Sequence, residues 1–210
     1  MRTIDLQSWP RRRHFELYSG FDHPHFGLCA SVDLTTFYPA IKQRGTSISL
    51  AIVHAITHTA NAIPEFRTRI RGDDVVEHEV VNASFTIGMG EDLFSFCTVT
   101  YYPEFAEFAE HAARQIAAAQ VNPELEYTPQ QDDVLYMTAI PWVSFTGFMH
   151  PMQLHPADSI PRFAWGKFFQ EGDQLKMPLS VQGHHALLDG YHVGKFYQLV
   201  QDYFNQFEIG

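Results

Sequence analysis

The chain has 210 residues, of which 45% are hydrophobic and 14% aromatic, so one large domain can form its core without disulfides or structural metals. Its formal net charge of −10 excludes the usual nucleic-acid-binding protein, because binding phosphates requires basic patches. Cys29 and Cys97 are too few for a disulfide framework and indicate a reducing compartment. The first residues lack the apolar segment of a signal peptide, and no apolar run is long enough to cross a membrane. We therefore expect a soluble, cytoplasmic protein that binds neither nucleic acid nor membrane.

The first half of the chain alternates helical and β patterns. In chain order we expect a helix over 8–18, a strand over 27–34, helices over 35–45 and 47–63, a hairpin over 67–81, and strands over 83–89 and 93–102. Ser8 is a good N-cap and Pro10 suits a first helical turn. Gly45 separates the next two helices, and Gly72 favours the hairpin turn.

The second half begins with an alanine-rich helix. We expect this helix over 103–121, a strand over 134–145 that Pro141 interrupts, a hairpin of the segments 162–169 and 174–185, and a closing helix over 191–207. Only the segment 122–133 has the composition of a linker. The pattern predicts one α/β domain over residues 1–210, with a mixed sheet and helices packed on it.

The segment HHALLDGYHVGKF, from His184 to Phe196, carries the most chemistry. His185 and Asp189 lie four residues apart where a strand passes into a helix, which is a common place for ligand binding. A histidine there can act as a general base, because its pKa lies near the working pH. The alternative is structural: His184 and His185 end a strand and Asp189 caps the helix. The residues alone leave both interpretations open.

Several motifs occur in the order found in one enzyme family. They are QSWPRRRHFELY near the N-terminus, the PEFR segment at 64–67, AIPWVSFT at 139–146, QEGD at 170–173, and HHxxxDG at 184–190, preceded by PLSVQ and followed by YHVGKF. Together they cover nearly the whole chain, which closely resembles the chloramphenicol acetyltransferases of type A, the HHxxxDG coenzyme-A-dependent acyltransferases.

This resemblance implies a fold, an assembly and a reaction. The fold is the coenzyme-A-dependent acyltransferase fold, a two-layer α/β sandwich, assembled as a homotrimer with active sites at subunit interfaces. Acetyl-CoA is the implied co-substrate, no cofactor is permanently bound, and a hydroxylated acceptor, most simply chloramphenicol, receives the acetyl group. His185 is the implied base, Asp189 forms a structural ion pair with Arg11, and Thr138 supplies the hydroxyl that hydrogen-bonds the oxyanion. Such a protein would confer antibiotic resistance.

The chain also departs from the family pattern. The family normally has serine at Thr138, often has threonine at Ala164, and has a pocket asparagine at Tyr136. The loop 19–27 does not resemble the matching pocket loop. Tyr18, Phe94 and Phe148 fall where the family has aromatic pocket residues, and Lys167 matches a basic residue near the nucleotide end of coenzyme A, although another family lysine is replaced around Ser47.

Other readings compete with these. Asp22, His23, His25 and Cys29 have no standard zinc spacing, and we expect a polar loop there and no metal site. His54 and His58 share a helix face without the glutamate of a metalloprotease, so core or interface histidines are expected. Two further functions stay open: a same-fold acyltransferase for another alcohol or thiol, and a non-catalytic trimeric homologue.

Overall fold

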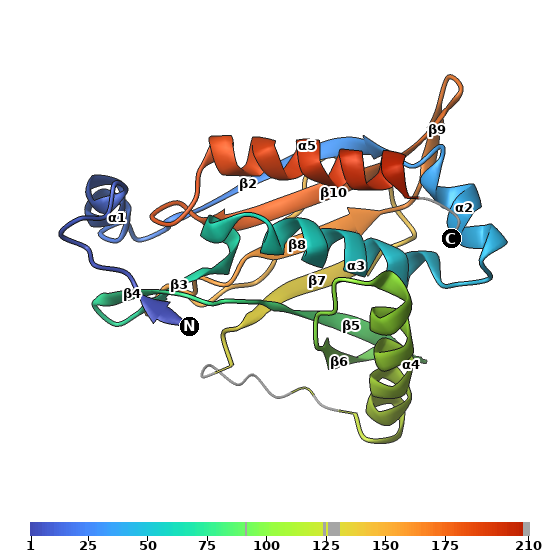
Figure 1. Ribbon diagram of the computed structural model, residues 1–210, viewed down its shortest axis with the longest axis horizontal. Helices are drawn as coiled ribbons and strands as arrows, with labels where there is room; N and C mark the ends of the chain where they lie inside the picture. Colours follow the sequence, from blue (N-terminus) through green and yellow to red (C-terminus); the bar gives the residue numbers. More distant parts are fainter. Residues whose placement is uncertain (91, 124, 126–130, 208–210) are drawn as a thin grey trace.

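The computed structural model describes residues 1–90, 92–123, 125 and 131–207. Its elements are β1 (Arg2–Thr3), α1 (Arg12–Tyr18), β2 (His25–Asp33), α2 (Phe37–Gln43), α3 (Ile48–Asn61), a 3-10 helix η1 (Pro64–Arg67), β3 (Thr68–Arg71), β4 (Asp74–Glu77), β5 (Asn82–Gly90), β6 (Leu93–Val99), α4 (Phe105–Val121), β7 (Val134–Ile140), β8 (Arg162–Gly166), β9 (Phe169–Glu171), β10 (Gln174–His184) and α5 (Gly190–Gln206). Figure 1 shows α3 and α5 lying across one face of a large sheet.

The large sheet is mixed, as the sequence predicts. Its strand order is β2-β10-β8-β7-β5-β6, and β9 adds to β10 at the end of a projecting hairpin (Figure 1). β7 runs parallel to both β5 and β8, whereas the other pairs are antiparallel. A separate small sheet of order β1-β4-β3 lies near the N-terminus. The prediction of an α/β fold with helices on a mixed sheet is confirmed.

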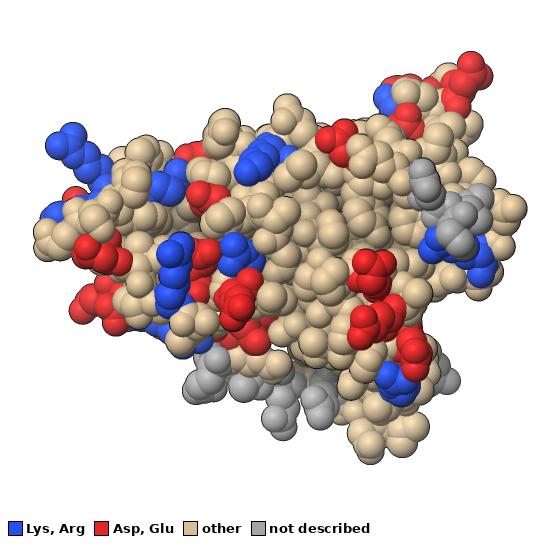
Figure 2. All heavy atoms as spheres, viewed as in Figure 1, with Lys and Arg blue, Asp and Glu red and all other residues tan. Residues whose placement is uncertain are grey.

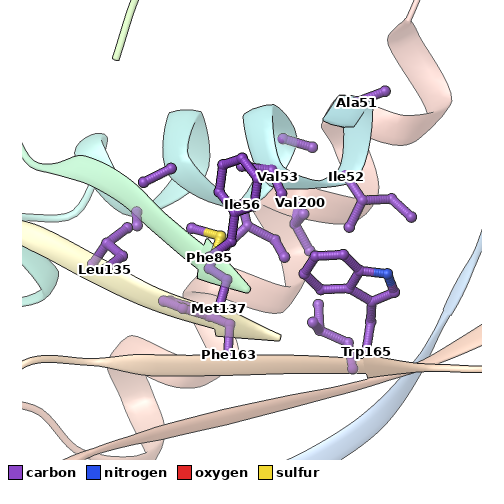
Figure 3. Close-up of a cluster of buried hydrophobic side chains, with 14 of the residues drawn as sticks. Ala51, Ile52, Val53, Ile56, Phe85, Leu135, Met137, Phe163, Trp165 and Val200 are labelled. Carbon is purple, nitrogen blue, oxygen red and sulfur yellow. The ribbon is translucent and has the colours of Figure 1, made fainter. Parts of the chain in front are cut away.

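The core lies between the sheet and the helices α3 and α5. Alternate strand residues face the helices, and Figure 3 shows them packed beneath α3 and Val200 of α5. The strands contribute Phe85, Leu135, Met137, Phe163 and Trp165, and α3 contributes Ala51, Ile52, Val53 and Ile56. Burying these side chains stabilises the fold by roughly 1.5–3 kcal/mol for each large one. This layer gives the strand ends a rigid support.

The opposite face of the sheet carries polar and aromatic residues. Ser84, Thr86, Thr138 and Gln182 occupy the alternate positions there, and the segment 141–160 crosses the face along β10. The Ser180 hydroxyl donates to the Phe148 carbonyl at 3.3 Å, and other bonds of this kind hold the segment in place. No helix covers this face in the part of the chain that the structure describes.

Two predicted boundaries were wrong. The first helix begins at Arg12 and not at Ser8, because the Ser8 hydroxyl binds the Asp5 carboxylate at 2.8 Å instead of capping a helix. The strand expected over 134–145 ends at Ile140, since Pro141 has no N–H for the ladder and pairing does not resume. Much of the linker-like segment 122–133 lies outside the described residues. None of the described helices is long and apolar enough to cross a membrane.

Candidate active site

A tight turn joins β10 to α5 and carries the central histidine. The N–H groups of Leu187 and Leu188 donate to the carbonyl of His184 at 3.0 and 3.2 Å, which closes the turn. Gly183 is favoured beside it, because a Cβ at that position would lie 2.8 Å from Leu188 Cδ1 and would force this side chain to shift. Leu188 is itself buried in the core. The turn is therefore fixed to the core on one side, with His185 projecting from it.

The His185 ring is held between two aromatic side chains. Tyr18, the last residue of α1, stacks on it with ring centroids 4.0 Å apart and an interplanar angle of 4°. Phe26 of β2 contacts it at 4.8 Å. The backbone N–H of His185 donates to the Pro24 carbonyl at 2.8 Å. Nδ1 is buried and has no hydrogen-bond partner among the described residues, so Nε2 is the ring nitrogen left to meet a substrate.

Asp189 both caps α5 and forms an ion pair. Its carboxylate accepts from the Tyr191 N–H at 3.0 Å and so caps α5. Its other oxygen lies 2.7 Å from Arg11 Nη1, so the ion pair that the resemblance implies is present. Burial by itself raises the pKa of Asp189, but the hydrogen bond from Arg11, the charges of His192 and Arg11, and the Tyr191 N–H together outweigh burial, and the pKa falls to about 2. The carboxylate is therefore charged at neutral pH.

We expect Asp189→Asn to lower both stability and turnover. Asparagine keeps an oxygen for the helix cap but removes the charge that binds Arg11. Losing a charge-assisted hydrogen bond of this half-buried kind costs roughly 1.5–3 kcal/mol, or a thermal midpoint lower by about 3–10 °C for a domain of this size. The matched control is Glu16→Gln, which removes the exposed Arg12–Glu16 pair on the same helix and should change little. An unchanged midpoint for Asp189→Asn would count against a stabilising ion pair.

Thr138 of β7 lies on the sheet face that no described helix covers, away from this turn. Its hydroxyl is 3.0 Å from that of Thr86 on β5, and its register partner on β8 is Ala164. Ala164 offers no hydrogen-bonding group, so Thr86 is the neighbouring hydroxyl here. In the described chain no hydrogen bond or ring contact joins Thr138 to His185. One chain thus keeps the two groups in separate regions.

The predicted acceptor residues divide in the same way. Tyr18 lies against His185, whereas Phe94 on β6 is 48% exposed and contacts Phe96. Tyr136 lies on the uncovered face beneath the Arg162 guanidinium, which is 5.2 Å from the ring centroid. Phe148 contacts the His150 ring from the segment 141–160. The aromatic residues thus lie partly at the turn and partly on the open sheet face.

Lys167 and Ser47 have different settings. Lys167 follows β8 with an exposed side chain, and its backbone N–H donates to the Val143 carbonyl at 2.9 Å. Ser47 caps α3, where its hydroxyl accepts from the Leu50 N–H. An exposed lysine after a central strand is free to bind a phosphate, whereas the serine contributes to helix stability.

Sequence reasoning missed the part of the loop 19–27 that touches His185. Phe26 and the Pro24 carbonyl both contact this histidine, although the loop departs from the family pattern. His25, between them, is buried and donates through Nε2 to the Asp158 carbonyl, which ties the loop to the segment 141–160. Burial lowers the pKa of His25, so the ring is neutral at pH 7. An aromatic residue two positions past a proline was the only signal available.

The histidines that could have suggested a metal site have other partners. His54 is buried in the helical layer, and His58 hydrogen-bonds Tyr101 at 2.9 Å. Within the described residues, no group of three His, Cys, Asp or Glu side chains is placed to hold a metal ion. His25 is engaged by Asp158, as described above.

Comparisons with known proteins show which family this chain resembles. The family model of chloramphenicol acetyltransferase matches residues 1–201. The chain is 31% identical over 202 residues to chloramphenicol acetyltransferase 2 of Escherichia coli, covering 94% of each protein. It is 29% identical over 211 residues to a Klebsiella chloramphenicol acetyltransferase, covering 99% of this chain and 95% of the relative.

Solved structures extend the comparison to the fold. A chloramphenicol acetyltransferase structure superimposes with a TM-score of 0.87 at 25% identity, covering 97% of this chain and 99% of the other. A probable dihydrolipoamide acetyltransferase from Listeria monocytogenes has a TM-score of 0.65 at 18% identity, with coverages of 98% and 95%. The second likeness concerns the fold alone.

Proposed function

The chain belongs to the chloramphenicol acetyltransferase family and is an acyltransferase, and from this premise we propose that it transfers the acetyl group of acetyl-CoA to a hydroxyl of chloramphenicol, with His185 as general base. The observation that carries the assignment of the base is the setting of His185: an imidazole clamped between Tyr18 and Phe26, with Nδ1 buried. Clamping the ring fixes the direction of Nε2, which is what a general base requires.

The reaction follows from that direction. Nε2 takes the proton of the acceptor hydroxyl as its oxygen attacks the thioester carbonyl. The tetrahedral intermediate then collapses, the C–S bond breaks, and the imidazolium returns the proton to the departing sulfur. Both substrates react directly, so no acyl-enzyme forms and no cofactor stays bound.

Thr138 is our candidate for stabilising the negative oxygen of that intermediate. Its hydroxyl lies 3.0 Å from the Thr86 hydroxyl, on the sheet face that no described helix covers. When the Thr86 hydroxyl donates to Thr138, the Thr138 proton is free to be donated to the oxyanion. One oxyanion donor is typically worth about 10²–10³ in rate. Since threonine has a stiff χ1, contact with Thr86 helps to aim the hydroxyl.

We propose that the acceptor pocket is aromatic, with walls formed by Tyr18, Phe94, Phe148 and Tyr136. An aromatic acceptor such as chloramphenicol fits this lining. The exposed Lys167 is our candidate for binding the nucleotide phosphates of coenzyme A. Its position beyond the end of β8 leaves room for a large co-substrate outside the core.

A homotrimer with sites between subunits accounts for two features. In the described part of one chain no hydrogen bond or ring contact joins His185 to Thr138, so we propose that a facing subunit completes the site. The uncovered face also exposes large apolar side chains on β6 and the segment 141–160. They are Phe94, Phe96, Trp142, Val143 and Met149. Burying such a patch between copies removes it from water.

We further propose that the protein works in the cytoplasm and confers resistance to chloramphenicol. Both cysteines, Cys29 and Cys97, are free, which fits a reducing compartment. Acetylating a hydroxyl changes the shape and hydrogen bonding of the antibiotic, so the modified drug would no longer fit a target that recognises that group.

The purified protein should release coenzyme A thiol from acetyl-CoA only when chloramphenicol is added. Thiol release is followed with a thiol-reactive dye, and the acetylated product by mass spectrometry. If chloramphenicol gives no release, a panel of alcohols and thiols tests a second candidate, a same-fold acyltransferase with another acceptor. Tyr136 beneath Arg162 favours that candidate, because a large ring fills the place of a small pocket amide. Inactivity with every acceptor would instead support a non-catalytic homologue.

A further inference from the structure

A second pair of residues, Glu65 and His192, supports Asp189 in addition to Arg11. His192 lies in the first turn of α5 and is 8% exposed. Its Nδ1 accepts from the Asp189 backbone N–H at 3.1 Å, which completes a capping box. Its Nε2 lies 3.4 Å from Glu65 Oε1. Nδ1 also lies 3.0 Å from Asp189 Oδ1, so the His192 ring contacts both the backbone and the side chain of Asp189 on one edge and Glu65 on the other.

Glu65 lies on a rigid element of the fold. It belongs to η1, whose next residue, Phe66, is fully buried and packs against Phe163 and Phe196. The Thr68 hydroxyl donates to the Pro64 carbonyl at 2.9 Å and closes the 3-10 turn. The hydrogen bond from His192 lowers the pKa of Glu65, so the carboxylate is charged. Glu65 therefore offers His192 a charged acceptor on a rigid element.

The Glu65–His192 pair is connected to the turn between β10 and α5 through the Asp189 backbone. Asp189 follows the hydrogen-bonded turn at His184 directly, so its position sets the end of the segment that carries His185. Arg11 holds the Asp189 side chain, whereas His192 holds its backbone N–H. These two attachments come from opposite ends of the chain. Figure 2 shows oppositely charged side chains mixed at this end of the molecule, whereas the surface over α3 and α5 has few.

We propose that Glu65 and His192 are positioning residues for the acyl transfer reaction: they hold the Asp189 backbone and, through the turn, the orientation of His185. The inference rests on the proposed function, because it presumes that His185 is the base. A displacement of about 1 Å at a reacting group can cost up to 10²-fold in rate. The pair should therefore affect kcat and leave both KM values unchanged.

The experiment separates this role from simple helix capping. Glu65→Ala should lower kcat about tenfold, within the range that a small displacement produces. Glu65→Gln keeps an acceptor oxygen and should recover most of the loss. His192→Asn keeps an acceptor near the Asp189 N–H but cannot reach Glu65, so it should resemble Glu65→Ala. If the pair acts as one unit, the double variant should lose no more than either single variant.

The control is Glu110→Ala, which removes the exposed Glu110–Arg114 pair on α4 and should leave kcat unchanged. Circular dichroism checks each fold, and if Glu65→Ala does not fold, His192→Asn decides the question. A normal kcat in Glu65→Ala or in the deciding variant, with His185→Ala inactive, would overturn the inference alone. Raised KM values at constant kcat would also overturn it, since the pair would then belong to a binding wall. Full activity in His185→Ala would instead refute the proposed function.

Discussion

His185→Ala should reduce kcat for acetyl transfer by about 10²–10⁴-fold, the usual contribution of a positioned general base. Alanine cannot accept the hydroxyl proton, and no described neighbour of the ring offers a second base, because Tyr18 and Phe26 pack on its faces. KM for acetyl-CoA should change little. The readout is the initial rate of thiol release at saturating acetyl-CoA and acceptor.

Two controls make this result specific. His111→Ala removes a histidine that stacks on Tyr102 near α4 and should keep the parent rate. His185→Gln keeps a polar side chain of similar length between the aromatic rings and should be as inactive as alanine. Residual activity above about a tenth of the parent rate, where base removal costs at least 10²-fold, would contradict the assignment of His185 as base.

The protein should lose much of its stability on mild acidification, between about pH 6 and 4.5, because several histidines are buried in neutral form. Burial lowers the pKa of His54 to about 4, and likewise that of His184 to about 4. Burial and the nearby Arg162 charge lower the pKa of His150 to about 4. The Ala186 N–H donates to His184 Nδ1, so this ring nitrogen carries no proton, and the Tyr203 hydroxyl lies 2.7 Å from His54 Nδ1, where it can donate to a neutral ring.

The sign follows from comparing the two states. An unfolded histidine has a pKa of about 6.5, so below this pH the unfolded chain binds protons that the folded chain refuses. Stability is therefore complete above about pH 6.5 and falls until the folded groups protonate near pH 4. Each histidine costs roughly 1.4 kcal/mol per pH unit, and three together cost on the order of 6 kcal/mol between pH 6 and 4.5. A domain is typically stable by only about 5–15 kcal/mol.

Urea unfolding followed by circular dichroism, at fixed protein concentration from pH 7.5 to 4.5, measures this slope. His54→Gln retains a donor for the Tyr102 carbonyl but cannot titrate, so its slope near pH 5 should be smaller by about one proton. His14→Gln alters an exposed histidine on α1 and serves as the control. A parent slope near zero at pH 5, or one that His54→Gln leaves unchanged, would disprove the assignment.

The sequence by itself determined the elements whose signals are local. The helix now labelled α3 was recognisable from its apolar residues, and the hairpin turn at Gly72 from its glycine, which has a φ of 61°. The motif around His185 and Asp189 also located the candidate base, His185, and the ion pair between Asp189 and Arg11. These features depend on residues close in sequence or on a pattern shared across a family.

The tertiary structure alone decided what surrounds that motif. Phe26 contacts His185 and Glu65 contacts His192 from distant segments, and neither contact has a specific sequence signal, because a phenylalanine or a glutamate serves many roles. The strand order brought them there: β2 pairs with β10 along its whole length, and η1 packs beside α5 through Phe66 and Phe196. Local propensity cannot specify such contacts, since they depend on which strands become neighbours when the core is buried.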